Sequence, residues 1–238
     1  MRKIIYVFIL IIFVVSVTTS TCFSYPFKVG EKLVYTLKLV GFPIGTQVMR
    51  VEGVSREDNK PLYVFSSIIQ GSDFFSLFYK LDDRIKSYVD MEKLYSRKVI
   101  MRIREGSRRE DIKVKINQNE TTVWNISTGE KWMQKTPSYP LDVLSLIYWI
   151  RAQDLQIGKK FKISLLDSTG KFKDVEFEVC KVDKVYTYLG VFPSILCQQT
   201  DTTDGIKVWF SQNKERFPLQ IQVSTPLGFL TAILKKIN

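Results

Sequence analysis

Alternation of apolar and polar residues with a period of two runs along most of this chain, and it restricts the chain to a β-rich fold. The clearest example is the segment 97–116, whose two halves can fold back on each other around Gly106. Such a hairpin pairs Val99 with Val114 and Met101 with Ile112 on an apolar face, and Arg102 with Asp111 and Arg104 with Arg109 on a charged face. One buried and one solvated face are typical of an antiparallel sheet. The Arg104–Arg109 pair joins like charges, which destabilises the hairpin unless an anion binds there.

The same alternation predicts further strands at 32–40, 46–54, 62–70, 79–90, 161–166, 172–184, 191–200, 207–211, 219–224 and 229–235. Turns that contain glycine or proline separate many of these segments. Helices do not alternate with the strands, which argues against a doubly wound α/β fold. We therefore predict a mainly β fold in a single exported domain, 25–238. Its core is one large curved antiparallel sheet, or half-barrel, with one buried helix.

The segment 140–151 departs from this rhythm and has helical spacing. Its apolar positions include Val143, Leu144, Ile147 and Ile150. Because the segment is nearly apolar all round, we expect the helix to be buried against the sheet. Asp142 lies near the start of this helix, where a carboxylate favours the helix dipole. We interpret Asp142 as a structural cap, and a buried role at the mouth of a cavity is the alternative.

Residues 1–24 have the pattern of a secretory signal peptide. Two basic residues precede an uncharged apolar run, 4–17, and a short polar segment follows it. The run is shorter than the roughly 20 apolar residues of a membrane-spanning helix. The predicted cleavage lies between Ser24 and Tyr25, and no transmembrane span is expected after signal removal. An uncleaved anchor and a lipidated Cys22 are the alternatives.

The chain carries a net charge of +11, from 35 basic and 24 acidic residues. Removal of the signal leaves 33 basic and 24 acidic residues, a net charge of +9. For an exported protein this charge is compatible with contact with an anionic envelope component, such as a lipid headgroup or a glycan. It does not predict nucleic-acid binding, because export removes the protein from the cytoplasm. A generally lysine-rich solvated surface is the alternative.

Histidine is absent from the chain, which removes the commonest general base and the commonest metal ligand. We therefore expect no enzyme of the familiar serine, cysteine or zinc kinds, no cofactor and no metal, although chemistry by carboxylate, lysine or tyrosine stays open. The acidic pairs Asp82-Asp83 and Glu176 with Glu178 could share acid–base work or hold a cation. We favour a solvated face for these carboxylates.

Two cysteines, Cys180 and Cys197, follow the predicted signal, and an oxidising compartment permits a bridge between them. A hairpin centred between Tyr188 and Leu189 places the two cysteines directly opposite each other. Facing residues have Cβ atoms about 4.5–5.5 Å apart, close to the range of a disulfide. A disulfide is one prediction and two small buried thiols are the other.

An aromatic cluster and a basic stretch are the candidate ligand-binding residues. Phe74, Phe75 and Phe78 follow Ser72, a plausible helix cap, so they could form a short lid over the sheet and rim an apolar pocket; packing in the core is the alternative. The basic stretch could contact an anionic headgroup or lie on a solvated strand face. The full candidate set is Phe74, Phe75, Phe78, Trp149, Arg102, Arg104 and Arg109.

Several short motifs occur in a characteristic order. They are FKVGEKLVY at 27–35, IGT at 44–46, FYKLDD at 78–83, DVLSLIYWIR at 142–151, VWFS at 208–211 and RFPL at 216–219, with Gly158 and Gly228. In this order they resemble the bacterial exported family called domain of unknown function 3108, over roughly 27–234. The resemblance implies a protein of the bacterial envelope, in the periplasm, and no established reaction. By looser analogy, a sheet curled around one helix is similar to the half-barrel of periplasmic lipoprotein carriers.

Two functions follow from these observations. The first is a non-catalytic carrier that holds a hydrophobic or amphipathic ligand between the sheet and the helix. The second is a structural or assembly factor that acts through contacts with an envelope protein. A hydrolase that uses carboxylates alone is a third, weaker hypothesis. An open apolar cavity between helix and sheet favours the carrier, whereas a filled interior with an exposed apolar patch favours the assembly factor.

Overall fold

The computed structural model describes residues 25–203, 205–225 and 227–238, so the predicted signal and Cys22 lie outside the described residues. The first eight strands are β1 (Lys32–Leu39), β2 (Phe42–Glu57), β3 (Lys60–Gly71), β4 (Asp82–Asp90), β5 (Ser96–Glu105), β6 (Arg108–Ile116), β7 (Glu120–Asn125) and β8 (Glu130–Lys135). The other seven are β9 (Pro140–Asp142), β10 (Lys160–Leu166), β11 (Phe172–Thr187), β12 (Gly190–Gln199), β13 (Lys207–Ser211), β14 (Pro218–Thr225) and β15 (Gly228–Ile237). Two helices, α1 (Asp73–Ser76) and α2 (Val143–Ala152), complete the described fold.

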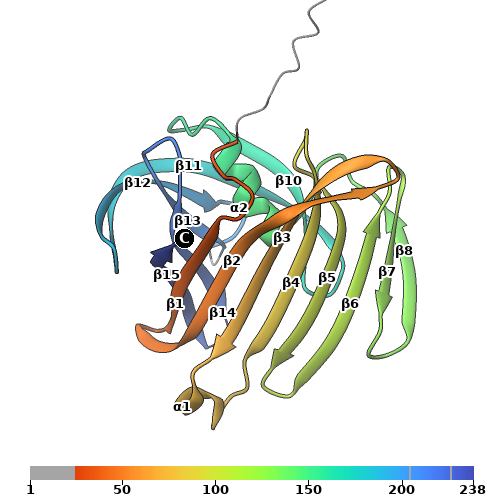
Figure 1. Ribbon diagram of the computed structural model, residues 1–238, viewed down its shortest axis with the longest axis horizontal. Helices are drawn as coiled ribbons and strands as arrows, with labels where there is room; N and C mark the ends of the chain where they lie inside the picture. The colour runs from red at the N-terminus through yellow and green to blue at the C-terminus, as the bar shows by residue number, and fades with distance from the viewer. Residues whose placement is uncertain (1–24, 204, 226) are drawn as a thin grey trace, which may run out of the picture.

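All fifteen strands belong to one curved sheet that wraps around α2 (Figure 1). Its order is β8-β7-β6-β5-β4-β3-β2-β1-β15-β14-β13-β12-β11-β10-β9, so β8 and β9 are the two edges. Neighbouring strands are antiparallel except β9 and β10, which are parallel. The sheet is not closed into a barrel. The predicted fold class, a large curved antiparallel sheet with one buried helix, is confirmed.

The two ends of the sheet approach each other at the β10–β11 turn. Arg108 donates a hydrogen bond to the Ser168 carbonyl at 3.1 Å. The side-chain amide of Gln134, on β8, donates to the Gly170 carbonyl at 2.7 Å. Gly170 has a φ of +81°, and a Cβ at this position would lie 2.7 Å from the Val123 side chain. A glycine is therefore required for the turn to pack this closely against β7.

The predicted hairpin of 97–116 has the register derived from its alternation. Met101 lies opposite Ile112, and Arg104 lies opposite Arg109. The like charges need no external anion, because the Arg104 guanidinium makes two hydrogen bonds to the Asp111 carboxylate, at 2.7 and 2.9 Å.

Three strands were missed by the sequence analysis, and one was placed too early. β7 has no alternation to detect, because Thr121, Thr122 and Val123 are all buried. β8 is a polar edge strand, and β9 has only three residues. β4 begins at Asp82, three residues after the predicted start, since Tyr79 and Lys80 belong to the connection that carries α1.

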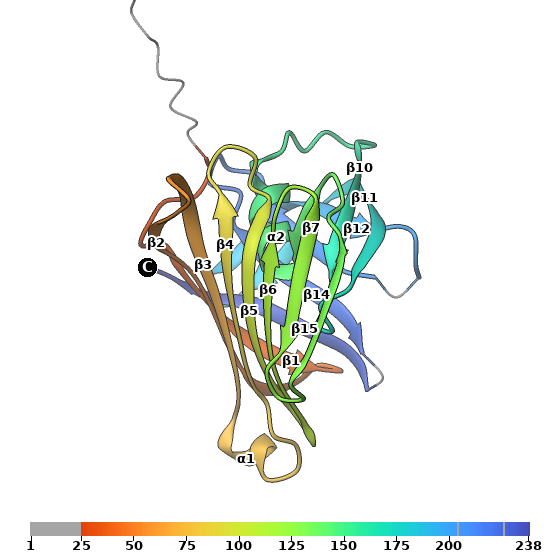
Figure 2. The same ribbon diagram turned by 90° about the vertical axis from the view of Figure 1, so that its right-hand side faces the viewer.

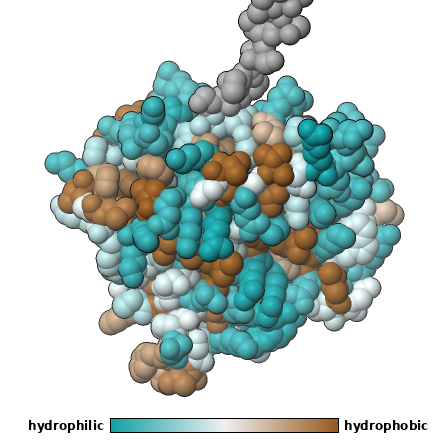
Figure 3. All heavy atoms as spheres, viewed as in Figure 1, coloured by the Kyte–Doolittle hydropathy of each residue, from teal (hydrophilic) through white to brown (hydrophobic). Residues whose placement is uncertain are grey.

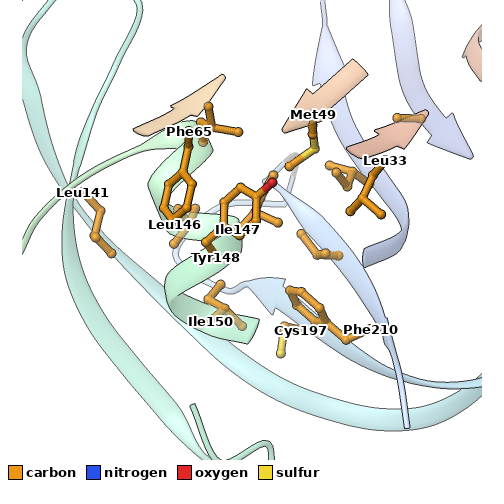
Figure 4. Close-up of a cluster of buried hydrophobic side chains, with 14 of the residues drawn as sticks. Leu33, Met49, Phe65, Leu141, Leu146, Ile147, Tyr148, Ile150, Cys197 and Phe210 are labelled. Carbon is orange, nitrogen blue, oxygen red and sulfur yellow. The ribbon is translucent and has the colours of Figure 1, made fainter. Parts of the chain in front are cut away.

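Helix α2 fills the space inside the curved sheet (Figure 4). The Tyr148 ring stacks on the Phe65 ring of β3 at 4.0 Å between centroids, and the Phe27 ring meets Tyr148 edge-on at 5.2 Å. Leu146 and Ile150 are fully buried in the same cluster. The prediction of a buried helix over 140–151 is confirmed. Neither helix within the described residues is long and apolar enough to cross a membrane.

Asp142 caps this helix, as predicted. Its carboxylate accepts hydrogen bonds from the backbone N–H groups of Leu144 and Ser145. It also accepts a hydrogen bond at 2.7 Å from each of the Ser87 and Ser96 hydroxyls, on β4 and β5. The cap thus joins the start of α2 to two strands that precede it by about fifty residues.

The other end of α2 is fixed by Arg151, which is completely buried. Its guanidinium makes two hydrogen bonds to the Glu31 carboxylate, at 2.6 and 2.8 Å. Its remaining N–H groups reach the carbonyls of Pro26 and Glu215, each at 2.7 Å. The Phe217 ring lies 5.1 Å from the guanidinium carbon. Arg151 therefore joins the helix to the start of the domain and to the β13–β14 connection.

The cysteine hairpin differs from its predicted register. Thr187 lies opposite Gly190 as expected, but a β-bulge at Cys180 shifts the pairing, so Cys197 lies opposite Val179. The two cysteines are therefore not a facing pair, and both thiols are free. Burial raises the pKa of the Cys197 thiol to about 12. The disulfide itself stays a prediction.

We predict that Arg151→Met destabilises the protein by about 3–5 kcal/mol, because it leaves the buried Glu31 carboxylate without a partner. The double variant Glu31→Leu/Arg151→Met should regain part of this loss, since it removes both charges. Urea unfolding followed by circular dichroism measures the free energies. Lys160→Met, at an exposed ion pair with Glu176, is the control and should leave the free energy of unfolding nearly unchanged. Equal losses for Arg151→Met and Lys160→Met would contradict this role of Arg151.

Candidate functional site

Six exposed apolar side chains gather on three neighbouring connections at one end of the sheet. We call this set the apolar tip. It comprises Val40 and Phe42 at the β1–β2 turn, Phe74, Leu77 and Phe78 on the β3–β4 connection, and Leu227 at the β14–β15 turn. Each of these side chains is between 59% and 78% exposed. So many exposed apolar groups on adjacent loops indicate a contact surface.

Backbone hydrogen bonds hold the three connections side by side. The Val40 N–H donates to the Phe229 carbonyl at 3.0 Å, which joins the β1–β2 turn to β15. The Ser72 N–H donates to the Ile44 carbonyl at 2.7 Å, which joins the α1 connection to β2. These contacts hold the three connections next to one another along the strand ends.

The α1 connection directs its aromatic side chains away from the sheet. Ser72 caps α1 by accepting a hydrogen bond from the Phe75 N–H at 3.3 Å, so the predicted cap is confirmed. Phe75 turns back to contact the core, whereas Phe74 and Phe78 meet edge-on at 5.6 Å and face solvent. The predicted lid over the sheet is wrong, because α1 projects beyond the strand ends (Figures 1 and 2). Core packing is likewise wrong for Phe74 and Phe78.

Basic side chains flank the tip on the adjacent strands. Arg84 and Arg102 share one carboxylate, Asp82, at 3.3 and 3.7 Å. Within the described part of the chain, Lys80 and Arg109 form no ion pair with a carboxylate. A backbone hydrogen bond from Gly106 to the Lys80 carbonyl, at 2.8 Å, holds the β5–β6 turn against the α1 connection. These cations form what we call the basic rim: Lys80, Arg84, Arg102 and Arg109.

The structure thus brings together only part of the predicted ligand set. Phe74, Phe78, Arg102 and Arg109 lie at the apolar tip or its basic rim. Arg104 is occupied by Asp111, as described above. Trp149 lies on α2, where its ring meets Phe161 of β10 edge-on at 5.4 Å, so it belongs to the core. The exposure of Phe42 was not predicted, because an apolar residue beside a strand is normally buried. Leu77 belongs with Phe74 and Phe78 to the aromatic segment that the sequence singles out, and it too faces solvent.

The two acidic pairs singled out in the sequence lie in different environments. Glu176 and Glu178 lie on β11 and share Lys160, at 3.4 and 3.5 Å, on a surface face, as favoured. Asp83 is instead only 8% exposed, and it accepts a hydrogen bond from the Arg104 N–H at 2.7 Å. Burial raises its pKa to about 7, and the neighbouring Glu105 carboxyl adds to this shift. Among the described residues, no group of three or more acidic or cysteine side chains could hold a metal ion.

Three of the surface hollows among the described residues lie away from the contact of Tyr148 on α2 with Phe65 on β3. The first, about 560 Å³, has a mixed lining that includes Lys60, Lys93, Arg97, Glu57 and Tyr95. The second, about 630 Å³, lies beside the Arg151 cluster and includes Tyr25, Lys28 and Asn238. The third, about 680 Å³, lies where the β8–β9 connection passes β10 and includes Tyr139, Ile163 and Phe172. Neither Phe65 nor Tyr148 lines any of these three hollows, so none of them lies where the carrier hypothesis places its ligand.

We predict that Asp83→Asn changes the pH dependence of stability. Native Asp83 holds its proton up to about pH 7, whereas the unfolded chain releases it near the ordinary pKa of 3.8. The free energy of unfolding of the wild type should therefore fall, relative to that of Asp83→Asn, as pH rises from about 4 to about 7. The relative slope is at most about 1.4 kcal/mol per pH unit, the value for one proton. Urea unfolding across this range measures both curves, and parallel curves would contradict the assignment.

Comparison with solved structures supports the fold. The chain is similar to a β-barrel-like protein of the domain of unknown function DUF1849 from Brucella abortus, with a TM-score of 0.54, 13% identity, and coverage of 87% of this chain and 96% of that one. It also matches a protein provisionally described as exported, with a YmcC-like fold, from Bacteroides fragilis (TM-score 0.36, 7% identity, 90% and 98% coverage). A third match is provisionally described as a lipoprotein, from Parabacteroides distasonis (TM-score 0.39, 11% identity, 90% and 97% coverage).

Comparison of sequences identifies the family. No curated protein matches this chain. A family model described as a protein of unknown function, DUF3108, matches residues 34–235, which is most of the chain and agrees with the resemblance of its ordered motifs. The chain therefore belongs to the DUF3108 family.

Proposed function

We propose that this protein is a non-enzymatic structural or assembly factor of the bacterial envelope, exported to the periplasm, that acts through contacts at its apolar tip. The observation that carries this proposal is the combination of a filled interior with six exposed apolar side chains beside the basic rim. The β11–β12 hairpin exposes a second apolar group, which includes Tyr186, Tyr188 and Val191. Proteins seldom expose clusters of large apolar side chains unless a partner covers them, and the proposal depends on this principle.

The filled interior argues against carriage of a ligand between helix and sheet. Phe65, Tyr148 and Phe27 occupy the space where an apolar chain would lie, and their ring contacts leave α2 packed against β3. A carrier of this design would have to move α2, which is tied at one end by Asp142 and at the other by Arg151. Contact at the surface requires no such movement.

The sheet edges are less suitable than the tip for binding a partner. Edge strands are commonly protected from strand addition by charged side chains, above all lysine. β8 carries Glu130, Lys131 and Lys135 on its exposed positions. At the other edge β9 pairs only with Ser164–Leu166 of β10, and the part of β10 that β9 leaves uncovered carries Lys160 and Lys162. The apolar tip has no comparable protection on its exposed aromatic residues.

Two sequence features support the location and the absence of a chemical step. Residues 1–24 have the charged, apolar and polar succession of a secretory signal. The chain lacks histidine, so the commonest acid–base catalyst is missing. The proposal therefore assigns the protein a binding role outside the cytoplasm.

Site-specific photo-crosslinking tests this role. A benzophenone amino acid replaces Phe78 in the full chain, expressed with its own signal in a bacterium. We expect irradiation to give a discrete adduct at this position, whether with lipid or with protein. The same probe at Tyr186, which is 74% exposed on β11, is the matched control and should give little adduct. Equal yields at the two positions would contradict a specific contact at the tip.

Native mass spectrometry tests the rejected carrier directly. We expect the wild type, purified without denaturant, to have the mass of the bare chain. The variant Phe74→Ser/Phe78→Ser should behave in the same way, because it alters only exposed side chains. A stoichiometric amphipathic ligand retained by both proteins would contradict the proposal, since the ligand would then bind away from the tip.

A further inference from the structure

We propose that the partner of the apolar tip is a membrane surface that contains anionic lipid, and that the tip inserts its apolar side chains into the interfacial region. This inference names the partner of the surface in the proposed function and rests on that function. It is carried by the shape of the tip, by the internal hydrogen bonds of its α1 connection and by the position of the basic rim.

The shape of the tip suits a lipid interface better than a folded protein. A stable protein partner usually covers about 800 Å² of fairly continuous surface on each side. The tip consists of turns at strand ends, and α1 extends furthest from the sheet (Figure 2). Exposed apolar residues mark this end in the space-filling view (Figure 3). Narrow projections can enter a fluid interface separately, without a complementary solid surface.

The α1 connection pairs several of its backbone N–H groups within itself. The N–H groups of Ser76, Leu77, Phe78 and Tyr79 donate to carbonyls of Ser72, Phe74 and Phe75, at 2.9 to 3.3 Å. The base of the connection is closed by a 2.8 Å hydrogen bond from the Gly71 N–H to the Leu81 carbonyl. Backbone groups that are already paired lose little when water is removed. These N–H groups therefore add little to the free energy needed to move the connection into the interfacial region.

The basic rim gives the tip a preference for negative charge. Arg84 and Arg102 have one carboxylate between them, and Lys80 and Arg109 have no ion-pair partner among the described residues. Asp73 is an opposing charge on α1, where it lies in the first turn and remains exposed. The cations thus outnumber the free carboxylate, and clustered cations near an apolar insertion are attracted to anionic headgroups. Salt should weaken this attraction by screening.

Vesicle co-sedimentation of the full mature chain tests the proposal. The probes are vesicles of phosphatidylcholine alone and of phosphatidylcholine with phosphatidylglycerol in equal parts, each at low and at high ionic strength. We expect binding to the anionic vesicles, weakened by salt. Phe74→Ser/Phe78→Ser should weaken binding about tenfold or more, because two large apolar side chains no longer leave water. Lys80→Gln/Arg109→Gln should reduce the preference for anionic vesicles while leaving residual apolar binding.

Two controls give each result a definite meaning. Tyr186→Ser removes an equally exposed aromatic ring outside the tip and should bind vesicles like the wild type. Thermal unfolding should be unchanged in Phe74→Ser/Phe78→Ser, which shows that lost binding is not lost folding. The inference is overturned if the wild type does not bind anionic vesicles. It is also overturned if Tyr186→Ser weakens vesicle binding as much as Phe74→Ser/Phe78→Ser does. If the wild type does not bind vesicles but the benzophenone amino acid at position 78 crosslinks to a protein, the partner is not a membrane. The proposed function then stands.

Discussion

The buried pair of Arg151 and Glu31 is the interaction on which the arrangement of this fold depends. A guanidinium that is fully removed from water is tolerated only when nearly all of its donors are paired. Here the donors meet one carboxylate and two backbone carbonyls, from segments that lie more than sixty residues from Arg151 in either direction. Arg216, in turn, donates to the carbonyls of Arg151 and Gln153, which fixes the end of α2. One side chain therefore joins the start of the domain, its helix and its last strands.

The same arrangement brings together three of the motifs noted in the sequence. The motif at 27–35 supplies Phe27 and Glu31, the motif at 142–151 supplies the cap and Arg151, and the motif at 216–219 supplies Phe217. They meet at α2 and hold it inside the sheet. Their role in this structure is to stabilise the fold, and the surface that we assign to function lies on other connections.

The sequence predicted local features well, because local alternation and turn residues determine them. The hairpin of 97–116 has the expected partners, and Asp142 caps the helix from its expected position. Features that depend on distant residues were not predictable. Nothing near Arg151 in the sequence indicates that Glu31 will neutralise it. The exposure of Phe74 and Phe78 depends on where the β3–β4 connection lies relative to the sheet, and a cluster of phenylalanines alone favours the core. The alternation of apolar and polar residues also could not predict the one-residue bulge at Cys180, which changes the partner of Cys197.

We propose that α2 is a fixed part of a filled interior and that the protein acts through its surface. Hydrogen exchange of the α2 amides, with and without a soluble lysolipid, distinguishes a fixed helix from a mobile one. For a fixed helix, these amides exchange only when the whole domain unfolds, and the lysolipid leaves their protection unchanged. Local opening of α2, with a gain of protection when the lysolipid binds, would show that the helix covers a ligand site and that the interior is not permanently filled.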